Sequence, residues 1–362
     1  MDGLENVVAA ETTLSDVDGL GGRLVIKGYS VEDIAGRLSF EQVAHLLLDG
    51  LVDGLPGPDE LGRRLGQARV QAFAQVAALD GELVARPPVE ALRALLARLP
   101  DGDDMETALR LLAGPAVFTS AIVRAQAGLA PIPPDPGLRQ AVDMLRMLKA
   151  AAPSRAEAAA LDAYLVTIVD HGFNASTFAA RVAASTRAGL TSAAIAGLCA
   201  LKGPLHGGAP GPVIEMLDEI GHADRALAWL EGALERGDRL MGFGHRIYRV
   251  RDPRADALKR AVQVLARGSK ALPGRLALAE AVEAAALDVL ARNKPDRSLK
   301  TNVEFYTAIL LEAVGFPADA FTCVFAGGRM AGWLAHAREQ VLSGRLIRPQ
   351  SRYVGPAPRE AA

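Results

Sequence analysis

The sequence predicts an all-α fold of two domains with a small β-hairpin near the N-terminus. Apolar residues recur at intervals of three and four over most of the 362 residues, which is the period of amphipathic helices. Hydrophobic residues make up 50% of the chain and aromatic residues only 5%, and the abundant alanine favours closely packed helices. At roughly 150 residues per domain, the length corresponds to two domains.

The elements follow in order from local patterns. Turn-forming residues at 18–22 precede the apolar run 23–27, which predicts the hairpin. Helices are then predicted where leucine, isoleucine and valine repeat with the helical period, at residues 139–150, 155–170, 227–234, 258–265 and 278–289.

Glycine and proline divide these helical segments. Prolines within residues 131–136 predict a rigid linker, and the densest Gly/Pro cluster spans residues 202–212. Pro210 and Pro212 suit the first turn of a helix that runs towards Ile220. Further breaks lie at residues 241–245 and 293–296. Because loops on a rigid scaffold commonly carry function, we expect the functional site at these breaks.

Composition excludes several classes of function. With 40 Lys+Arg against 42 Asp+Glu the net charge is −2, unlike that of a general nucleic-acid-binding protein. The first residues are acidic and no apolar run approaches the ~18 residues that span a bilayer, so we expect no signal peptide and no membrane segment. Cys199 and Cys323 are expected to be buried free thiols in a reducing compartment, and the protein to be cytoplasmic.

Three of the six histidines are candidates for chemistry. His171, His206 and His245 each lie at a glycine-containing break, whereas the other three are interpreted as structural, namely His45, His222 and His336. The candidates are 35 and 39 residues apart and have no cysteine beside them, so no metal site is predicted. His206 would lie near the positive end of the helix that starts at Pro210, which disfavours its imidazolium form.

Arginines are concentrated after His245. Four lie within residues 245–254, and Arg329 and Arg348 each stand beside glycine or proline. Both a solvated basic face and a site that binds carboxylates or phosphates are consistent with this run. Gly242 and Gly244 would let the backbone approach a ligand closely, although they form neither a P-loop nor a Rossmann motif.

Six motifs resemble, in order, those of the citrate synthase family over nearly the whole chain. They are an entry segment at residues 3–12 followed by residues 23–24 and 28–29, DHGFNASTF at 170–178, GPLHGGA at 203–209, GFGH at 242–245 with DPR at 252–254, TNVEFY at 301–306, and Arg348-Pro349. One such motif is modest evidence. Because all six occur in the family's order, the chain is identified as a member of the citrate synthase family.

The resemblance implies an all-α homodimer in which a small domain closes over a cleft. Residues 1–205 and 312–362 would form the large domain, and residues 206–311 the small domain with the coenzyme A site. The implied reaction is an acyl transfer of the tricarboxylic acid cycle, in which acetyl-CoA condenses with oxaloacetate and the citryl thioester is hydrolysed to citrate and CoA. No cofactor beyond the CoA thioester substrate is implied, and no nucleic-acid or membrane partner.

The resemblance also implies roles for individual residues. Glu304 would take a proton from the acetyl methyl group, His206 would donate to the thioester oxygen, and His245 would polarise the ketone. Oxaloacetate would be bound by His171, Arg254, Arg329 and, from the other subunit, Arg348. Coenzyme A would be bound by Arg249, Lys300, Gly242 and Gly244, with Lys294 or Arg297 as further candidates.

The sequence departs from the family in three places. Glu304 stands where the family has aspartate, and its extra methylene adds roughly 1.5 Å of reach. Pro210 and Gly211 replace the residues that usually follow the HGGA sequence, so the start of the helix behind His206 is expected to be reshaped. Thr301 replaces a proline, from which we expect a looser turn before Glu304.

Two other functions stay open beside citrate synthesis. One is condensation with another acyl-CoA, such as propionyl-CoA giving 2-methylcitrate, or with an altered keto acid. The other is a non-catalytic paralogue that binds CoA or dicarboxylates. This second function stays open because a base displaced by ~1 Å loses about 100-fold in rate. The alternative to a displaced base is that the neighbouring backbone or Tyr306 has shifted to accommodate the longer side chain of Glu304.

Overall fold

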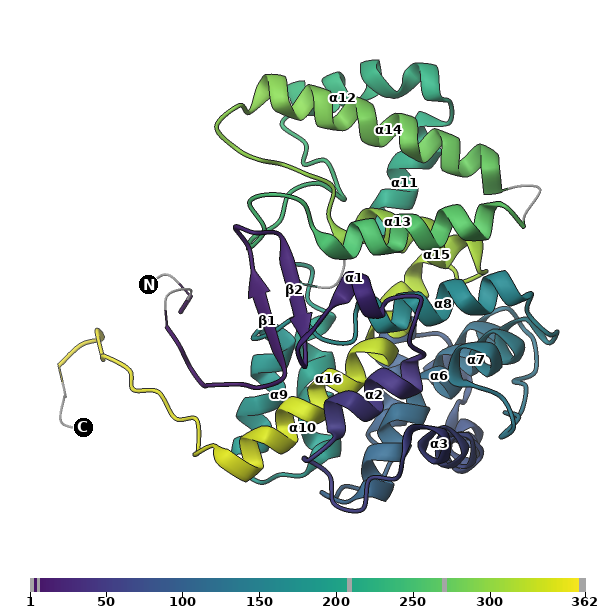
Figure 1. The fold of residues 1–362 in the computed structure, drawn as a ribbon, viewed down its shortest axis with the longest axis vertical. Helices are drawn as coiled ribbons and strands as arrows, with labels where there is room; N and C mark the ends of the chain where they lie inside the picture. The colour runs from purple at the N-terminus through teal and green to yellow at the C-terminus, as the bar shows by residue number, and fades with distance from the viewer. Residues whose placement is uncertain (1–2, 5–6, 207–209, 269–271, 358–362) are drawn as a thin grey trace, which may run out of the picture.

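The computed structural model describes residues 3–4, 7–206, 210–268 and 272–357, and confirms the all-α prediction (Figure 1). The helices are α1 (Val31–Ile34), α2 (Phe40–Leu48), α3 (Pro58–Phe73), α4 (Gly81–Val84), α5 (Pro88–Leu96), α6 (Met105–Gln126), α7 (Gln140–Lys149), α8 (Arg155–Thr167), α9 (Ala175–Ser185), α10 (Leu190–Leu201), α11 (Pro210–Ile220), α12 (Ala226–Glu235), α13 (Pro253–Ala266), α14 (Leu272–Asn293), α15 (Val303–Ala313) and α16 (Phe321–Ser343). Short 3₁₀ turns lie at η1 (Ala74–Ala78), η2 (Ala223–Arg225) and η3 (Ala318–Ala320).

The predicted hairpin is present and carries a third strand that the sequence did not predict. Strands β1 (Ser15–Asp18), β2 (Arg23–Ile26) and β3 (Tyr29–Ser30) form an antiparallel sheet in the order β1-β2-β3. Its tip meets the loop that follows α12: the Arg249 backbone N–H donates to the Gly19 carbonyl at 2.8 Å. A Cβ on Gly19 would lie 2.4 Å from the Ile247 carbonyl oxygen, so only glycine permits this approach.

The predicted helices are present; the ends of α7 and α12 lie within one residue of the predicted limits, whereas α13 and α14 begin five and six residues before the predicted ranges 258–265 and 278–289. The helix predicted at residues 155–170 ends at Thr167, because the chain turns there into the loop that carries His171. Capping boxes fix the starts of α2 and α8, at Ser39 and Ser154 respectively. Leu227, predicted on the buried face of α12, is 43% exposed, whereas Leu230 on the same helix is fully buried. The helical period identifies a face, but it does not say which residues of that face a neighbouring helix covers.

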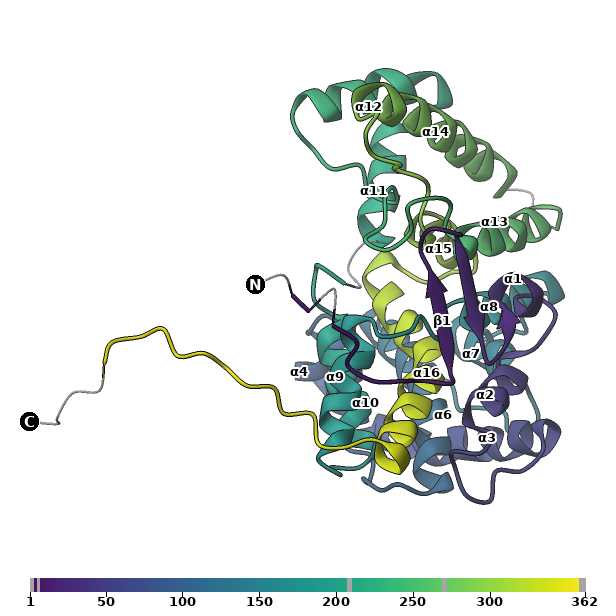
Figure 2. The ribbon, with the colours of Figure 1, turned by 60° about the vertical axis from the view of Figure 1, so that its left-hand side comes forward.

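The helices form two groups that meet at α13 and α15 (Figures 1 and 2). Helices α11, α12 and α14 gather at one end of the molecule, and α2 to α10 surround α16 at the other. Helix α13 packs on α8 of the larger group as well as on α15 and α14. The proposed domain limits at residues 206 and 311 stay predictions, since a boundary depends on which elements move together.

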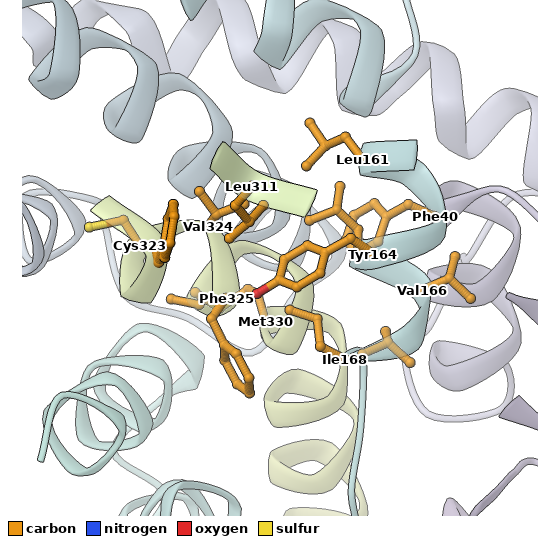
Figure 3. Packing of buried hydrophobic residues seen from close by; sticks show 14 of the residues in the cluster. Phe40, Leu161, Tyr164, Val166, Ile168, Leu311, Cys323, Val324, Phe325 and Met330 are labelled. Carbon is orange, nitrogen blue, oxygen red and sulfur yellow. The ribbon is translucent and has the colours of Figure 1, made fainter. Parts of the chain in front are cut away.

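Helix α16 lies at the centre of the larger group. Figure 3 shows side chains of α8, α15 and α16 meeting in the core, among them Tyr164, Leu311 and Met330. Helix α6, also in contact with α16, has 22 residues and is the one described helix long and apolar enough to cross a bilayer. Because 78% of its apolar window is buried inside the protein, it is accounted for as a core helix.

The two cysteines differ in their surroundings. Cys323 is fully buried, as predicted, and this burial raises the pKa of its thiol (Figure 3). Cys199 is exposed on α10, so the prediction of a buried thiol is wrong at this position. Its apolar sequence neighbours Leu198 and Leu201 occupy the buried face of α10, and the helical turn places Cys199 on the other face.

Candidate active site

Three of the family-like motifs form helix starts. The Asn174 side chain accepts two backbone N–H groups at the start of α9, Asp252 accepts one at α13, and Asn302 accepts one at α15. Each cap lies within three residues of a predicted functional residue: the histidine at 171, the arginine at 254 and the glutamate at 304. The caps therefore fix the backbone from which these side chains project.

His171 and His245 lie together with Tyr248. The His171 and His245 rings are 5.6 Å apart between centroids in an edge-to-face arrangement, and His171 Nε2 is 3.2 Å from the Tyr248 hydroxyl. Burial lowers the pKa of His171 well below its usual value, and lowers that of His245 to about 4, with the charge of Arg254 acting in the same direction. Both imidazoles are therefore neutral at physiological pH.

His245 and Arg254 present donors to the same space. His245 Nδ1 accepts the backbone N–H groups of Ile247 and Tyr248, at 3.0 and 3.1 Å, which leaves the ring proton on Nε2. That Nε2 lies 3.2 Å from Arg254 Nη2, which is also a donor. Arg254 is buried and held by Asp252 through contacts of 3.0 Å (Nε to Oδ1) and 2.9 Å (Nη2 to Oδ2). Two adjacent donors are suited to an anionic oxygen placed between them.

Arg329 is a buried cation that has no carboxylate partner among the described residues. It is 1% exposed, its Nε donates to the Ile168 carbonyl at 2.6 Å, and its guanidinium lies 4.8 Å from the Phe325 ring centroid. In the described part of the chain it forms no ion pair, and burial lowers its pKa to about 10. A buried charge of this kind is costly unless a counter-ion binds, so the site favours an anionic ligand.

His206 is anchored by one ring nitrogen. Its Nε2 lies 3.3 Å from the Ser176 backbone N–H and 2.9 Å from the Ser176 hydroxyl oxygen. The backbone N–H can only donate, so Nε2 accepts and the proton of the neutral ring is on Nδ1. Burial lowers the pKa of His206 to about 4, and the charges of Arg329 and Arg254 contribute. The neutral form expected from the helix dipole is thus produced chiefly by burial.

The helix behind His206 begins at Pro210, as predicted. The predicted reshaping of its start falls on residues 207–209, which lie outside the described residues.

Glu304 is the second residue of α15 and points a carboxyl oxygen into the protein. Its Oε2 is fully buried and has no hydrogen-bond partner among the described residues. Burial raises the pKa of Glu304 to about 7, against the opposing effect of Arg254 and Arg329. A carboxylate with this pKa and a free oxygen is suited to act as a general base at neutral pH.

The loosened turn predicted at Thr301 is not observed. The Thr301 hydroxyl donates to Glu283 Oε1 on α14 at 2.7 Å, and the Thr301 backbone pairs with Phe243 in an isolated β-bridge. The Asn302 N–H also donates to the Gly242 carbonyl at 2.9 Å. Hydrogen bonds therefore hold this turn in place of a proline ring.

Gly242 and Gly244 are required by this loop pairing. Their φ angles are 85° and 79°, a region that side chains other than glycine rarely adopt. A Cβ on Gly242 would lie 2.9 Å from Phe305, and one on Gly244 would lie 2.8 Å from Leu299. Their assignment to coenzyme A stays a prediction, beside this separate role in packing.

The basic coenzyme A candidates are exposed on two paired loops. Arg249 lies on the loop before α13, and Lys300 lies on the loop before α15, where its carbonyl accepts the Gly244 N–H at 2.8 Å. Lys294 and Arg297, also exposed, belong to the second loop. We refer to these four exposed residues as the basic edge; the bond between Gly244 and Lys300 joins its two loops next to His245.

Arg348 is separate from the other candidates in this chain. It is exposed and lies in the segment after α16, which extends away from the body of the molecule (Figure 2). Leu346, Tyr353 and Val354 of the same segment are also exposed.

The structure thus brings six predicted residues into one region, His171, His206, His245, Arg254, Glu304 and Arg329, and leaves Arg348 outside it.

Three positioning residues were missed. Ser176 bonds His206, Tyr248 bonds His171, and Asp252 bonds Arg254. Ser176 and Asp252 stand inside the quoted motifs and Tyr248 lies between GFGH and DPR. Contacts over as many as 77 residues of sequence cannot be read from local spacing. His336, interpreted as structural, is fully buried and lies 3.2 Å from Asp170 Oδ2, behind the His171 loop.

Among the described residues no group of histidine, cysteine and carboxylate side chains is arranged to hold a metal ion.

An anion held by Arg254 and Arg329 would lie beside a carboxyl group able to accept a proton at neutral pH. Fold and site together therefore define an all-α enzyme of acid–base chemistry on an anionic substrate. Residues 3–350 match the family profile described as "Citrate synthase, C-terminal domain", and the chain belongs to the citrate synthase family. It is an acyltransferase of the citrate synthase type.

Relatives and solved structures cover the whole length. The citrate synthase of Haloferax volcanii is 36% identical over 98% of this chain and 95% of its own. The 2-methylcitrate synthase of Mycobacterium tuberculosis is 36% identical over 98% and 90%. The structure of citrate synthase from Thermoplasma acidophilum, in ternary complex with carboxymethyl coenzyme A and oxaloacetate, has a TM-score of 0.86 with 30% identity over 99% of this chain and 97% of that one.

Proposed function

We propose that this protein condenses acetyl-CoA with oxaloacetate and hydrolyses the citryl thioester, with Glu304 as the base. The observation that carries the proposal is the unpartnered Oε2 of Glu304, in a carboxyl group whose pKa is raised to about 7. The α-hydrogen of a thioester is weakly acidic, so its removal requires both a base and a donor for the oxygen that becomes negative.

Oxaloacetate binding is assigned to the arginines and the paired histidines. Arg329 supplies a charge that has no ion-pair partner in the described chain, and Arg254 supplies a second next to the His245 donor. A dicarboxylate would compensate the charge of Arg329 and accept from Arg254, whose charge is already balanced by Asp252. A hydrogen bond from His245 Nε2–H to the ketone oxygen makes the ketone carbon more electrophilic.

His206 is the donor to the thioester oxygen. With Nε2 accepting from Ser176, its Nδ1–H remains for the substrate. A neutral imidazole with a pKa of about 4 stabilises the enolate by hydrogen bonding without first protonating it. The α-carbon of this enolate then attacks the ketone carbon, and the ketone oxygen takes up a proton to become the hydroxyl of the citryl thioester. Water then hydrolyses this thioester to citrate and CoA.

The assembly is part of the same proposal. The enzyme acts as a homodimer in the cytoplasm, and Arg348 of each chain completes the oxaloacetate site of the other. The exposed, extended segment that carries Arg348 supports this arrangement, because it contributes nothing to the site of its own chain. Coenzyme A is held along the basic edge that carries Arg249 and Lys300. Closure of the smaller helix group over the cleft keeps water from acetyl-CoA before condensation.

A thiol-release assay tests the proposal. Purified protein with oxaloacetate should release CoA from acetyl-CoA, and should do so faster than from propionyl-CoA. A higher rate with propionyl-CoA would assign the protein to 2-methylcitrate synthesis. Absence of release with both thioesters, together with calorimetric binding of oxaloacetate, would show a non-catalytic paralogue and overturn the proposal.

A further inference from the structure

The backbone before Glu304 is held on one side by the loop of the catalytic histidine. The Gly244 N–H donates to the Lys300 carbonyl at 2.8 Å, and the Asn302 N–H donates to the Gly242 carbonyl at 2.9 Å. These bonds connect two loops, both of which lack regular secondary structure for several residues. The Asn302 side chain also donates to the Gly244 carbonyl at 2.8 Å, and the Val303 N–H donates to Asp252 Oδ2 at 3.1 Å. These bonds hold the backbone of the turn and leave the Thr301 side chain available for a further contact.

Glu283 of α14 provides this further contact with the turn. Its Oε1 accepts the Thr301 hydroxyl at 2.7 Å, and its Oε2 accepts the Tyr306 hydroxyl at 2.6 Å and the Lys259 ammonium at 2.7 Å. The Glu283 side chain is 12% exposed, so these bonds are largely shielded from water. One carboxylate thus bonds to the residue three positions before Glu304 and to the residue two positions after it.

We propose that Glu283 is a positioning residue for the base: by bridging Thr301 and Tyr306 it fixes the backbone from which Glu304 reaches the acyl-CoA methyl group. The inference rests on the proposed function. The threonine hydroxyl replaces the constraint that a proline ring would give at this turn. This matters more for glutamate than for aspartate, because glutamate has one further rotatable bond and its reach depends more on where its backbone starts.

Glu283 acts through geometry rather than by contact with substrate. Both of its carboxylate oxygens are occupied, and the Lys259 ammonium balances its charge. The same ammonium lies 5.5 Å from the Tyr306 ring centroid, and Tyr306 is 1% exposed. The network is therefore closed around Tyr306 and Thr301, and Glu304 is the neighbouring residue that remains unbonded at Oε2.

The test measures kcat and KM separately in matched variants. Glu283→Gln and Thr301→Val should each lower kcat by about 10- to 100-fold, the range expected for a base displaced by up to ~1 Å, and leave the KM for oxaloacetate within about twofold. Thr301→Ser keeps the hydroxyl and should recover most of kcat. The double variant of Glu283→Gln with Thr301→Val should lose little more than either single variant, since both remove the same bridge.

Glu280 gives the control on the same helix. It accepts a hydrogen bond from Gln263 at 3.1 Å and has no bond to the turn before Glu304, so Glu280→Gln should keep kcat within about twofold. Unchanged kcat in Glu283→Gln, or an equal loss in Glu280→Gln, would overturn the proposal. A lower melting temperature with unchanged kcat would show a structural role only.

A crystal structure of Glu283→Gln separates this inference from the proposed function. We expect the Glu304 carboxylate to move by ~1 Å relative to the parent protein, a displacement of the size that affects catalysis. If the parent protein releases no CoA, the proposed function fails, and the position of Glu304 in the variant still decides the inference. An unmoved Glu304 would overturn it.

Discussion

Glu304 is a carboxyl group whose proton affinity is set by its surroundings. Burial raises its pKa to about 7, and Arg254 and Arg329 prevent it from rising further. The same two arginines help to keep His206 neutral. At the scale of residues, the buried cations therefore serve both halves of the chemistry: they keep the base ionisable near neutrality and the donor uncharged.

Removal of the carboxylate should separate binding from turnover. Glu304→Gln keeps the size of the side chain but cannot accept a proton, so turnover should fall by at least ~10²-fold, the lower range for general base catalysis. Oxaloacetate should bind as before, because its arginines and histidines are intact. Thiol release and calorimetry measure the two effects. Retained turnover would mean that another group is the base.

The dependence of activity on pH should follow the ionisation of Glu304. The base must be deprotonated, so kcat/KM should fall as the pH drops below about 7, the pKa set by burial, Arg254, Asp252 and Arg329. Asp162 provides a control, because burial also raises its pKa to about 7 while it bonds the Phe40 N–H at 3.0 Å. Asp162→Asn should leave the profile in place.

An apparent pKa near the ordinary value of a glutamate, ~4.3, would contradict the buried position of this base. If Asp162→Asn abolished the pH dependence, the titrating carboxyl group would be Asp162 and not Glu304.

At the scale of elements, the starts of helices were easier to predict than their packing. The apolar period predicted the starts of α7 and α8 to within one residue, and Pro210 predicted the start of α11. The outward positions of Cys199 and Leu227 were not predictable, because a helical period does not say which part of a face a neighbouring helix covers. The pairing of Ser176 with His206 likewise depends on how α9 and α10 pack.

The six site residues were predictable because their motifs resemble those of the family. The bonds that orient them join segments far apart in the sequence, as between Glu283 and Thr301, 18 residues away, or Tyr248 and His171, 77 residues away. Such contacts arise from tertiary packing. Sequence reasoning therefore identified the residues that come together in the structure but not the contacts that support them.

Helix α16 packs unusually close to the loop after α8, and this approach gives a test. A Cβ on Gly332 would lie 2.3 Å from the Val169 carbonyl oxygen, so Gly332→Ala must displace backbone next to the His171 loop. We expect a loss of about 1–3 kcal/mol in the free energy of unfolding, the range for overpacking, and weaker oxaloacetate binding. Urea unfolding and calorimetry measure these effects.

Gly327 of the same helix is the matched control. A Cβ there would meet the Pro115 side chain at 3.5 Å, an ordinary contact, so Gly327→Ala should be neutral or gain up to ~1 kcal/mol from helix propensity. Equal effects of the two substitutions would show that the close approach at Gly332 does not limit packing.

At the scale of the whole molecule, the site combines both helix groups and, in our proposal, a second chain. Arg329 comes from α16, whereas Arg254 and Glu304 come from α13 and α15, where the two groups meet. In our proposal, binding of the dicarboxylate is therefore coupled through the arginines to closure of the two groups. Arg348, on its extended segment, has no place in this arrangement within one chain.

Mixed dimers provide the decisive test of the role of Arg348. Arg348→Ala and Glu304→Gln homodimers should both have little activity. In a heterodimer of the two, one site combines the intact Glu304 of the first chain with the intact Arg348 of the second and should be active. Random assortment of equal amounts makes about half of the dimers mixed, so roughly a quarter of all sites should recover. If Arg348 instead served its own chain, each site of a mixed dimer would carry one defect and activity would not recover. That result, or full activity of Arg348→Ala alone, would contradict the shared site.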